Sequence, residues 1–418
     1  MSDAPSPGLG EYRATCRKWF EGNLALRTSE TPEMLGDEED QVLQARLYDA
    51  GYSGFAFPKT YGGAGLSLAE QVAFFDEASR YVTPTGFGVS IGMIAPTILD
   101  HGSDQLKAKY LPQALRGDLR FIQLLSEPSG GSDLASVMTR ATRDGDVFVI
   151  NGSKMWSSGA RLATNGLLLA RTDWDVPKHH GVTMFVVALD TPGITIEDIA
   201  LADGSIRFCQ EYFDDVEIGI ENVLGEVNQG WSVAHTLLLH ERRATVGTGF
   251  GYGYMKRGAV SGGVQAQPGQ MTRDLLALAA RRGAAKRPAI RQLIGKATAE
   301  AVAHDFARRR IMEGQTRGDL SSQWGSLLKL GRGTASPLLA ELSLSIAGSP
   351  GVIAESPDAP AGGQGSEWLV SRGPSIGGGT NEMQRNIVSE RLLGFPREAD
   401  PSRELPFREI LQRRGGRS

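Results

Sequence analysis

The sequence has little of what marks several protein classes. Only two cysteines occur among its 418 residues, Cys16 and Cys209, and neither has histidines at metal-ligand spacing. We therefore expect no disulfide framework, no metal site and a reducing compartment, the cytoplasm. No apolar run approaches the roughly 18 residues of a membrane-spanning helix, and the first residues lack the charged and apolar regions of a signal peptide. The formal net charge of −4 lacks the basic excess of a nucleic-acid-binding protein.

The chain is long enough for two or three domains of the usual size, about 100–200 residues each. A helical pattern fills residues 1–120 and includes a capping box from Ser67 to Glu70, in which hydroxyl and carboxylate each satisfy a backbone amide. Short alternating runs fill residues 121–225, the helical pattern returns over 226–400, and residues 401–418 form a tail. The alternating runs predict strands at 148–150, 167–170, 182–187 and 194–196. We predict an α+β multi-domain fold: a helical domain, a β-barrel-like middle domain and a C-terminal helical bundle.

One stretch concentrates small hydroxyl residues and glycines next to a tryptophan. It contains Ser126-Glu127-Pro128, Gly130-Gly131-Ser132-Asp133 and Asn151-Gly152-Ser153-Lys154-Met155-Trp156-Ser157-Ser158. Asn-Gly between β-prone runs is a strong hairpin signal, so we expect a turn at Asn151 and Gly152. Such a surface can hold a flat, hydrogen-bonding ring, with hydroxyls at its edge and an indole against its face. Each motif alone is more often an ordinary loop or a core tryptophan, and it is their joint spacing that indicates a cofactor site.

This combination resembles the flavin site of the acyl-CoA dehydrogenases. Two C-terminal segments strengthen the resemblance, Ile376-Gly377-Gly378-Gly379-Thr380-Asn381-Glu382-Met383-Gln384-Arg385 and Ser389-Glu390-Arg391-Leu392-Leu393-Gly394-Phe395-Pro396-Arg397. The resemblance runs from about residue 57 to residue 397, and the order of helical, β and helical regions fits it. It implies FAD as cofactor, an acyl-CoA thioester as substrate and its 2,3-enoyl form as product. It also implies an electron-transfer flavoprotein or a similar acceptor.

The resemblance assigns cofactor and substrate contacts in two places. The first lies around the flavin ring, with Ser126 at its pyrimidine edge, Trp156 beside it and Ser158 near N5. The second is a helix N-terminus, suited to the pyrophosphate of FAD, although a plain N-cap is the alternative for its threonine. The expected cofactor contacts are Leu124, Leu125, Ser126, Ser132, Trp156, Ser157, Ser158, Thr380, Asn381 and Glu382. The expected substrate contacts are Ser132, Arg242 and Gly379.

The catalytic base is where the chain departs from the commonest family pattern. Many members carry Glu directly before the Gly-Thr, but position 378 is glycine here, and glycine cannot take a proton. The isovaleryl and long-chain members place Glu on a C-domain helix, immediately before an Arg, which corresponds here to Glu241 and Arg242. A Glu-Arg pair on a helix is usually a solvated surface; the match to the family motif makes Glu241 the expected base. It would remove the α-proton while the β-hydrogen leaves as hydride to the flavin.

A second departure concerns assembly. The family's Arg-x-Thr-Phe-Gly motif is missing from residues 280–288, and its Gly-Gly-Asn-Gly loop is altered at residues 345–351. Both are elements that a subunit donates to its partner's cofactor. The chain is therefore expected to keep a site of its own but to serve its neighbour's cofactor poorly, as heteromeric members of the family do. The expected assembly is a homodimer, a homotetramer or a heterotetramer with a related chain.

Two other functions stay open at this point. The chain is either an active dehydrogenase or a partner subunit with incomplete FAD sites. A flavin monooxygenase or nitroalkane-type oxidase on the same fold is a narrower alternative, which the placement of the carboxylate does not favour. Small residues expected at the pocket floor, Gly86, Gly88 and Gly92, permit a fatty, branched or steroid-type acyl group.

Overall fold

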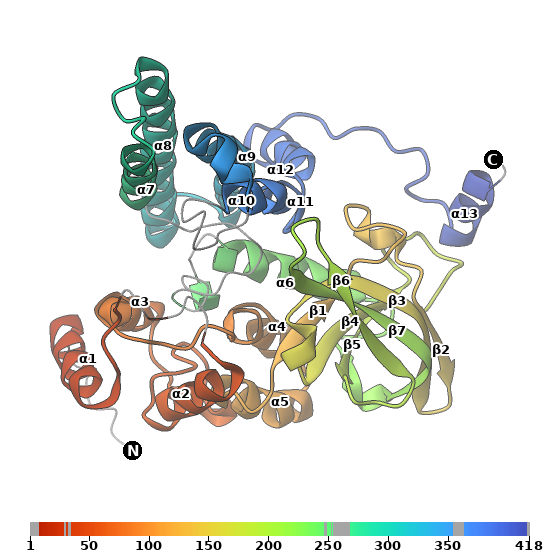
Figure 1. The fold of residues 1–418 in the computed structure, drawn as a ribbon. Helices are drawn as coiled ribbons and strands as arrows, with labels where there is room; N and C mark the ends of the chain where they lie inside the picture. The colour runs from red at the N-terminus through yellow and green to blue at the C-terminus, as the bar shows by residue number, and fades with distance from the viewer. Residues whose placement is uncertain are drawn as a thin grey trace. The chain divides into compact units, whose positions relative to one another are not determined.

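The computed structural model describes residues 8–28, 31, 35–245, 249–251, 253, 268–353 and 363–415. The chain divides into two compact units, whose helices and strands are labelled in Figure 1. The first unit comprises Met1–Ile199, Phe208–Gly258 and Ala399–Ser418; the second comprises Ala200–Arg207 and Ala259–Glu398. Within the described ranges, no helix is both long and apolar enough to cross a membrane.

Helices of the first unit pack around an aromatic core. The ring of Phe20 lies 5.0 Å from that of Phe74, which in turn lies 5.0 Å from Tyr52. The capping box predicted at Ser67 is confirmed: its hydroxyl accepts from the Glu70 amide, and the Glu70 carboxylate accepts from the Ser67 amide at 2.7 Å. A five-residue π-helical turn, Ser90–Ile94, precedes α4. The helices are α1 Leu9–Asn23, α2 Asp37–Asp49, α3 Leu68–Glu77, α4 Ala95–His101, α5 Asp104–Arg116, α6 Gly230–Thr245 and α13 Phe407–Gly415.

Eight strands form one sheet in the order β6-β7-β3-β2-β4-β5-β8, with β1 paired parallel to β4. The strands are β1 Phe121–Leu124, β2 Arg140–Asp144, β3 Val147–Ser158, β4 Asn165–Arg171, β5 Val182–Ala188, β6 Ile194–Ala200, β7 Ile206–Gly219 and β8 Val223–Leu224. Alternate residues such as Phe148, Ile150 and Phe185 form its buried core. Each run predicted as β from its alternation lies inside one of these strands, so those strand predictions are confirmed.

The turn predicted at Asn151 and Gly152 is wrong. Strand β3 runs straight through both residues, and the hairpin to β2 closes six residues earlier, where Asp144 pairs with Val147. The register against β7 shifts between Ile150 and Gly152, which marks a bulge. A Cβ at Gly152 would lie 2.7 Å from the Cα of Thr139, and the residue has φ +148°. Glycine is needed here for close approach of another backbone, and not for a hairpin turn.

The C-terminal residues, predicted as a tail, hold α13. Phe407 is fully buried, stacks on Trp174 with ring centroids 5.7 Å apart, and lies 4.3 Å from the guanidinium of Arg171. The amides of Phe407 and Arg408 donate to the carbonyls of Val176 and Trp174, both at 2.9 Å. These contacts fix α13 to the loop that follows β4.

We expect Phe407→Ala to release α13 from this loop. Losing the buried ring should cost about 2 kcal/mol of the free energy of unfolding of the docked helix, from its apolar area. Trypsin should then cleave after Arg403 or Arg408 sooner than in the wild type. Gln412→Ala, at an exposed position of α13, is the matched control, because it leaves both cleavage sites and the buried ring in place. Unchanged cleavage of the Phe407 variant would show that the ring does not hold the helix.

The second unit is helical. Its core contains Leu278, Ile294, Leu342 and Ile346, from three long helices packed on one another. The helices are α7 Pro268–Arg281, α8 Pro288–Arg317, α9 Gly325–Ala347, α10 Gln364–Val370, α11 Gly373–Ile376 and α12 Asn381–Ile387, followed by a π-helical turn, Val388–Leu392. Residues 280–288, which lack the family's Arg-x-Thr-Phe-Gly motif, include the connection between α7 and α8.

Candidate active site

A buried ion pair fixes the loop after β1. Lys154 on β3 donates to Glu127 at 2.8 Å and to the Leu125 carbonyl at 3.0 Å, and both charged side chains are almost completely buried. Glu127 also accepts from the amides of Met138 and Thr139, at 2.6 and 2.9 Å. Burial opposes ionisation of Glu127, but Lys154 and these donors outweigh it and lower its pKa. The carboxylate therefore ties the two ends of the loop that carries Ser126 and Ser132.

Burial lowers the pKa of Lys154 to about 8, although the charge of Glu127 acts in the opposite direction. Arg171 adds a second buried cation nearby, and burial lowers its pKa to about 10. Arg171 donates to the carbonyls of Ala135 and Lys178, so the same interior charges hold both the Ser132 loop and the loop under α13.

Trp156 stands at a second bulge of β3. The register against β7 shifts between Met155 and Ser157, and Trp156 between them has φ +69°. A left-handed backbone is unusual for a bulky residue and costs of order 1–3 kcal/mol, so the surroundings must impose it. The indole is half exposed and meets the ring of Phe208 edge-on, with ring centroids 5.8 Å apart. Because of the bulge, the side chain of Trp156 points outward. Regular alternation along β3 would have placed it on the opposite face of the sheet.

The other residues expected at the flavin ring lie close to this bulge. The Met155 amide donates to the Ser126 carbonyl at 2.9 Å, which brings the Ser126 loop alongside β3. Leu124 and Leu125 are buried, Ser126 and Ser158 are half-buried, and Ser157 is buried. Ser132 is exposed next to Asp133, which pairs with Lys178 at 2.7 Å.

Glu241 lies half-buried on α6 and contacts β1. Gln123, directly before Leu124, donates from Nε2 to Oε2 of Glu241 at 3.4 Å. The neighbouring His240 is buried and contacts Asp100 on α4 at 2.9 Å, which fixes this part of α6. The candidate base and the start of the candidate flavin loop are therefore joined through one residue of β1.

Arg242 follows Glu241 and is largely buried. Burial lowers its pKa, while the charge of Glu241 raises it. Its Nε has no hydrogen-bond partner in the described ranges. A buried cationic donor without a partner is costly, so this nitrogen is suited to a carbonyl or anionic oxygen.

The remaining predicted residues lie in the second unit, in the turn before α12 and in the first two residues of that helix. Gly378 and Gly379 have φ +68° and +86°, and the Gly379 carbonyl accepts from Lys329 at 3.1 Å. The hydroxyl of Thr380 accepts from the Met383 amide at 3.2 Å, so it acts as an N-cap. Oδ1 of Asn381 is buried without a partner among the described residues. Glu382 is exposed and pairs with Arg385.

Gly86, expected at the pocket floor, has another role. Its amide donates to the buried carboxylate of Asp40 at 2.8 Å, and a Cβ would lie 2.7 Å from that oxygen. A side chain at this position would displace Asp40, so Gly86 is explained by a helix contact. Gly92 lies buried in the π-helical turn. In the parts of the chain that the structure describes, no cluster of His, Cys, Asp or Glu could hold a metal ion.

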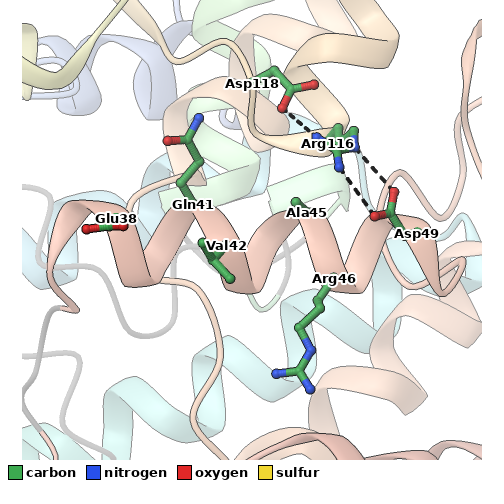
Figure 2. A pocket seen from close by; sticks show the side chains of 8 residues that line it. All are labelled: Glu38, Gln41, Val42, Ala45, Arg46, Asp49, Arg116 and Asp118. Atoms are coloured by element: carbon green, nitrogen blue, oxygen red, sulfur yellow. Dashed lines mark hydrogen bonds and ion pairs between the residues drawn. The ribbon is translucent and has the colours of Figure 1, made fainter.

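A surface hollow of about 380 Å³ lies elsewhere, over α2 (Figure 2). Arg116 at its edge is held between Asp49 and Asp118. None of the residues expected to bind cofactor or substrate lines it.

Comparison with known proteins decides the family. Residues 8–118, 123–216 and 228–393 match the N-terminal, middle and C-terminal domains of acyl-CoA dehydrogenases. The chain is 34% identical over 403 residues to the acyl-CoA dehydrogenase IpdE1 of Mycobacterium tuberculosis, an alignment that covers 93% of this chain and 98% of the relative. The chain belongs to the acyl-CoA dehydrogenase family.

Solved acyl-CoA dehydrogenase structures agree with the fold. One is the Tcur3481-Tcur3483 steroid ACAD, with a TM-score of 0.73, 31% identity and coverage of 95% of this chain and 100% of that one. Another is the ChsE4-ChsE5 complex from Mycobacterium tuberculosis, with a TM-score of 0.70, 26% identity and coverage of 95% and 100%. The predicted fold class is confirmed. The chain is an FAD-dependent oxidoreductase that dehydrogenates acyl-CoA thioesters at a CH–CH bond.

Sequence reasoning missed four residues that contact the candidate site residues: Gln123, Glu127, Lys154 and Glu211. Three are charged residues in or beside strands, where a charge usually indicates solvent. Lys154 and Glu211 lie opposite each other in the register of β3 with β7, a pairing that the sequence does not show.

Proposed function

We propose that Glu241 is the general base of the dehydrogenation. The observation that carries this is its contact with Gln123, which brings a half-buried carboxylate to the strand that leads into the Ser126 loop. Position 378, where many relatives have the base, is a glycine in a left-handed turn. A base must be ionised and within reach of the α-carbon. Arg242, with its buried unpaired Nε, would hold an oxygen of the substrate or orient the carboxylate.

FAD fits the residues around Trp156. The half-exposed indole offers a face for a flat ring, while Ser126 and Ser158 offer hydroxyls at its margin. The strained bulge supports a functional role, because it leaves a large aromatic side chain half exposed at a position with φ +69°. When bound, FAD supplies the hydride acceptor. The chain's own part is to hold the ring between the Ser126 loop and β3, and to keep the base on α6.

We expect Trp156→Gly to separate cofactor binding from stability. Glycine accepts φ +69° without strain, so the FAD-free protein should unfold at the same temperature as the wild type or higher. The affinity for FAD should fall about ten-fold through loss of the aromatic contact, measured by flavin fluorescence during titration. Tyr212→Ala, an exposed aromatic of β7, is the control and should leave FAD affinity unchanged. Equal affinity in the glycine variant would place the flavin elsewhere.

A bulky acyl group, of the steroid type, is the substrate class we propose. A solved relative at 31% identity is described as a steroid ACAD, and the π-helical turn beside β1 carries Gly92, which takes up little space. The test is anaerobic bleaching of bound flavin by acyl-CoA thioesters of straight, branched and polycyclic acids. Bleaching by short straight chains alone would contradict this substrate class.

A heteromeric assembly with a related chain is the proposed quaternary state, with an electron-transfer flavoprotein as acceptor. Its support is the altered sequence at residues 280–288 and 345–351, together with the likeness to a ChsE4-ChsE5 complex. Native mass spectrometry of the protein expressed alone and with a candidate partner chain tests it. A homotetramer with one FAD per chain would favour the homomeric alternative, and FAD without bleaching by any thioester would favour a non-catalytic partner subunit.

A further inference from the structure

Glu211 is a buried carboxyl group on β7 that the dehydrogenation mechanism does not use. Its side chain is fully buried and faces the interior of the sheet together with Cys209 and Phe213. Ser157 on β3 donates to its Oε2 at 2.8 Å, while its Oε1 has no hydrogen-bond partner in the described part of the chain. Burial raises the pKa of Glu211 to about 7, and the Ser157 hydrogen bond opposes the shift only in part. The carboxyl therefore changes charge near neutral pH.

Ser157 transmits this change to β1. Its single hydroxyl proton can go to Glu211 or to the Gln123 carbonyl, which lies 3.4 Å from the same oxygen. When Glu211 is ionised, Ser157 donates to it. When Glu211 takes a proton from solvent, the acid can donate to Ser157 Oγ, and the Ser157 proton is free for the Gln123 carbonyl. The protonation state of Glu211 thus determines whether Ser157, which lies between Trp156 and Ser158, donates to Glu211 or to the Gln123 carbonyl.

Few other ionisable groups surround Glu211 in the described residues. Cys209 lies two residues away on β7, and burial raises its pKa with a smaller contribution from Glu211. Lys154 pairs with Glu211 in the β3–β7 register, but its ammonium is bonded to Glu127 and to the Leu125 carbonyl. Glu241 accepts from the side chain of Gln123, the residue whose carbonyl lies near Ser157. Among the residues that the structure describes, no cation therefore neutralises an ionised Glu211 by direct contact.

We infer that Glu211 is a positioning residue that tunes the bound flavin, by placing a buried negative charge and an altered Ser157 hydrogen bond beneath the Trp156 strand as pH rises. The inference rests on the proposed flavin site. Electron uptake adds negative charge to the flavin, and a buried anion nearby disfavours that charge. The reduction potential of the wild type should therefore fall more steeply above pH 7 than that of a variant with a neutral side chain at position 211.

The experiment compares flavin potentials of the FAD-loaded protein from pH 5.5 to 9 for the wild type and for Glu211→Gln. The two should coincide at the acid end, where both side chains are neutral. Above pH 7 the ratio of reduced to oxidised flavin at a fixed potential should be about ten-fold higher in the variant, or about 30 mV for a two-electron couple. Glu217→Gln, an exposed carboxylate on the same strand, is the matched control and should follow the wild type.

Infrared difference spectra give a second measurement that needs no folded variant. The wild type should show a protonated carboxyl band that disappears on titration through pH 7, and its absence at acid pH would overturn the inference. Parallel potential curves in the two proteins would also overturn it. If the flavin responds to Trp156→Gly but not to Glu211→Gln, this inference alone fails. If Trp156→Gly leaves the affinity for FAD unchanged, both the proposed flavin site and this inference are refuted.

Discussion

Glu241→Gln is expected to slow flavin reduction by a cognate acyl-CoA about 10²–10⁴-fold, or about 3–5 kcal/mol in the activation barrier. Glutamine keeps the shape of the side chain and can still accept from Gln123, but it cannot take a proton. FAD content and acyl-CoA affinity should therefore stay close to wild type. Stopped-flow absorbance under anaerobic conditions separates the reductive step from binding.

Glu226→Gln provides the matched control for this experiment. Glu226 is exposed in the segment that precedes α6, so the same chemical change there should leave the rate unaltered. Wild-type rates in the Glu241 variant would move the base to another residue or to a partner chain. A loss of FAD together with activity would instead indicate that α6 had been disturbed.

Lys154→Met is expected to destabilise the protein by about 3–5 kcal/mol, because it leaves the buried Glu127 without its cation. Both side chains are almost fully removed from solvent, so water cannot replace the missing partner. Without this ion pair, the loop that carries Ser126 and Ser132 should also become less ordered. Urea unfolding followed by circular dichroism measures the first effect, and FAD affinity reports the second.

A double-mutant cycle tests the physical reason. Glu127→Gln in the Lys154→Met background removes the unpaired charge, and its single amide oxygen can still accept from the amide of Met138 or from that of Thr139. Part of the lost stability should return. Arg161→Met, which removes an exposed ion pair with Asp198, should change stability little. Additive effects of the two buried changes would show that the pair is not coupled.

The sequence predicted those parts of the fold that depend on local rules. The capping box at Ser67 and the alternating strands are decided by neighbours along the chain. The turn predicted from Asn151-Gly152 was wrong because glycine at position 152 is required by a contact with Thr139. That residue directly precedes β2, the strand that pairs with β3. Distant contacts of this kind leave no periodicity in the sequence.

The site was predictable to a lesser degree. Family motifs indicated Trp156 as a flavin contact and Glu241 as the base. The amino-acid sequence did not indicate a bulge at Trp156 or a hydrogen bond between Gln123 and Glu241. Lys154 and Glu211 look like solvated positions, because burial of a charge depends on partners supplied by other strands. Their assignment needed the register of β3 with β7 and the path of the loop after β1.

Helix α6 groups with the first unit, although residues 228–393 match the family's C-terminal domain. The border between compact parts therefore falls after Glu241, and the border between family domains falls before it. Exchange of Ala259–Glu398 for the equivalent segment of a relative would consequently leave Gln123, Trp156 and Glu241 in a single inherited block. Chimeric enzymes cut at this border would show whether residues 259–398 set the choice of partner chain, because the proposed base and its contact with Gln123 would be unchanged.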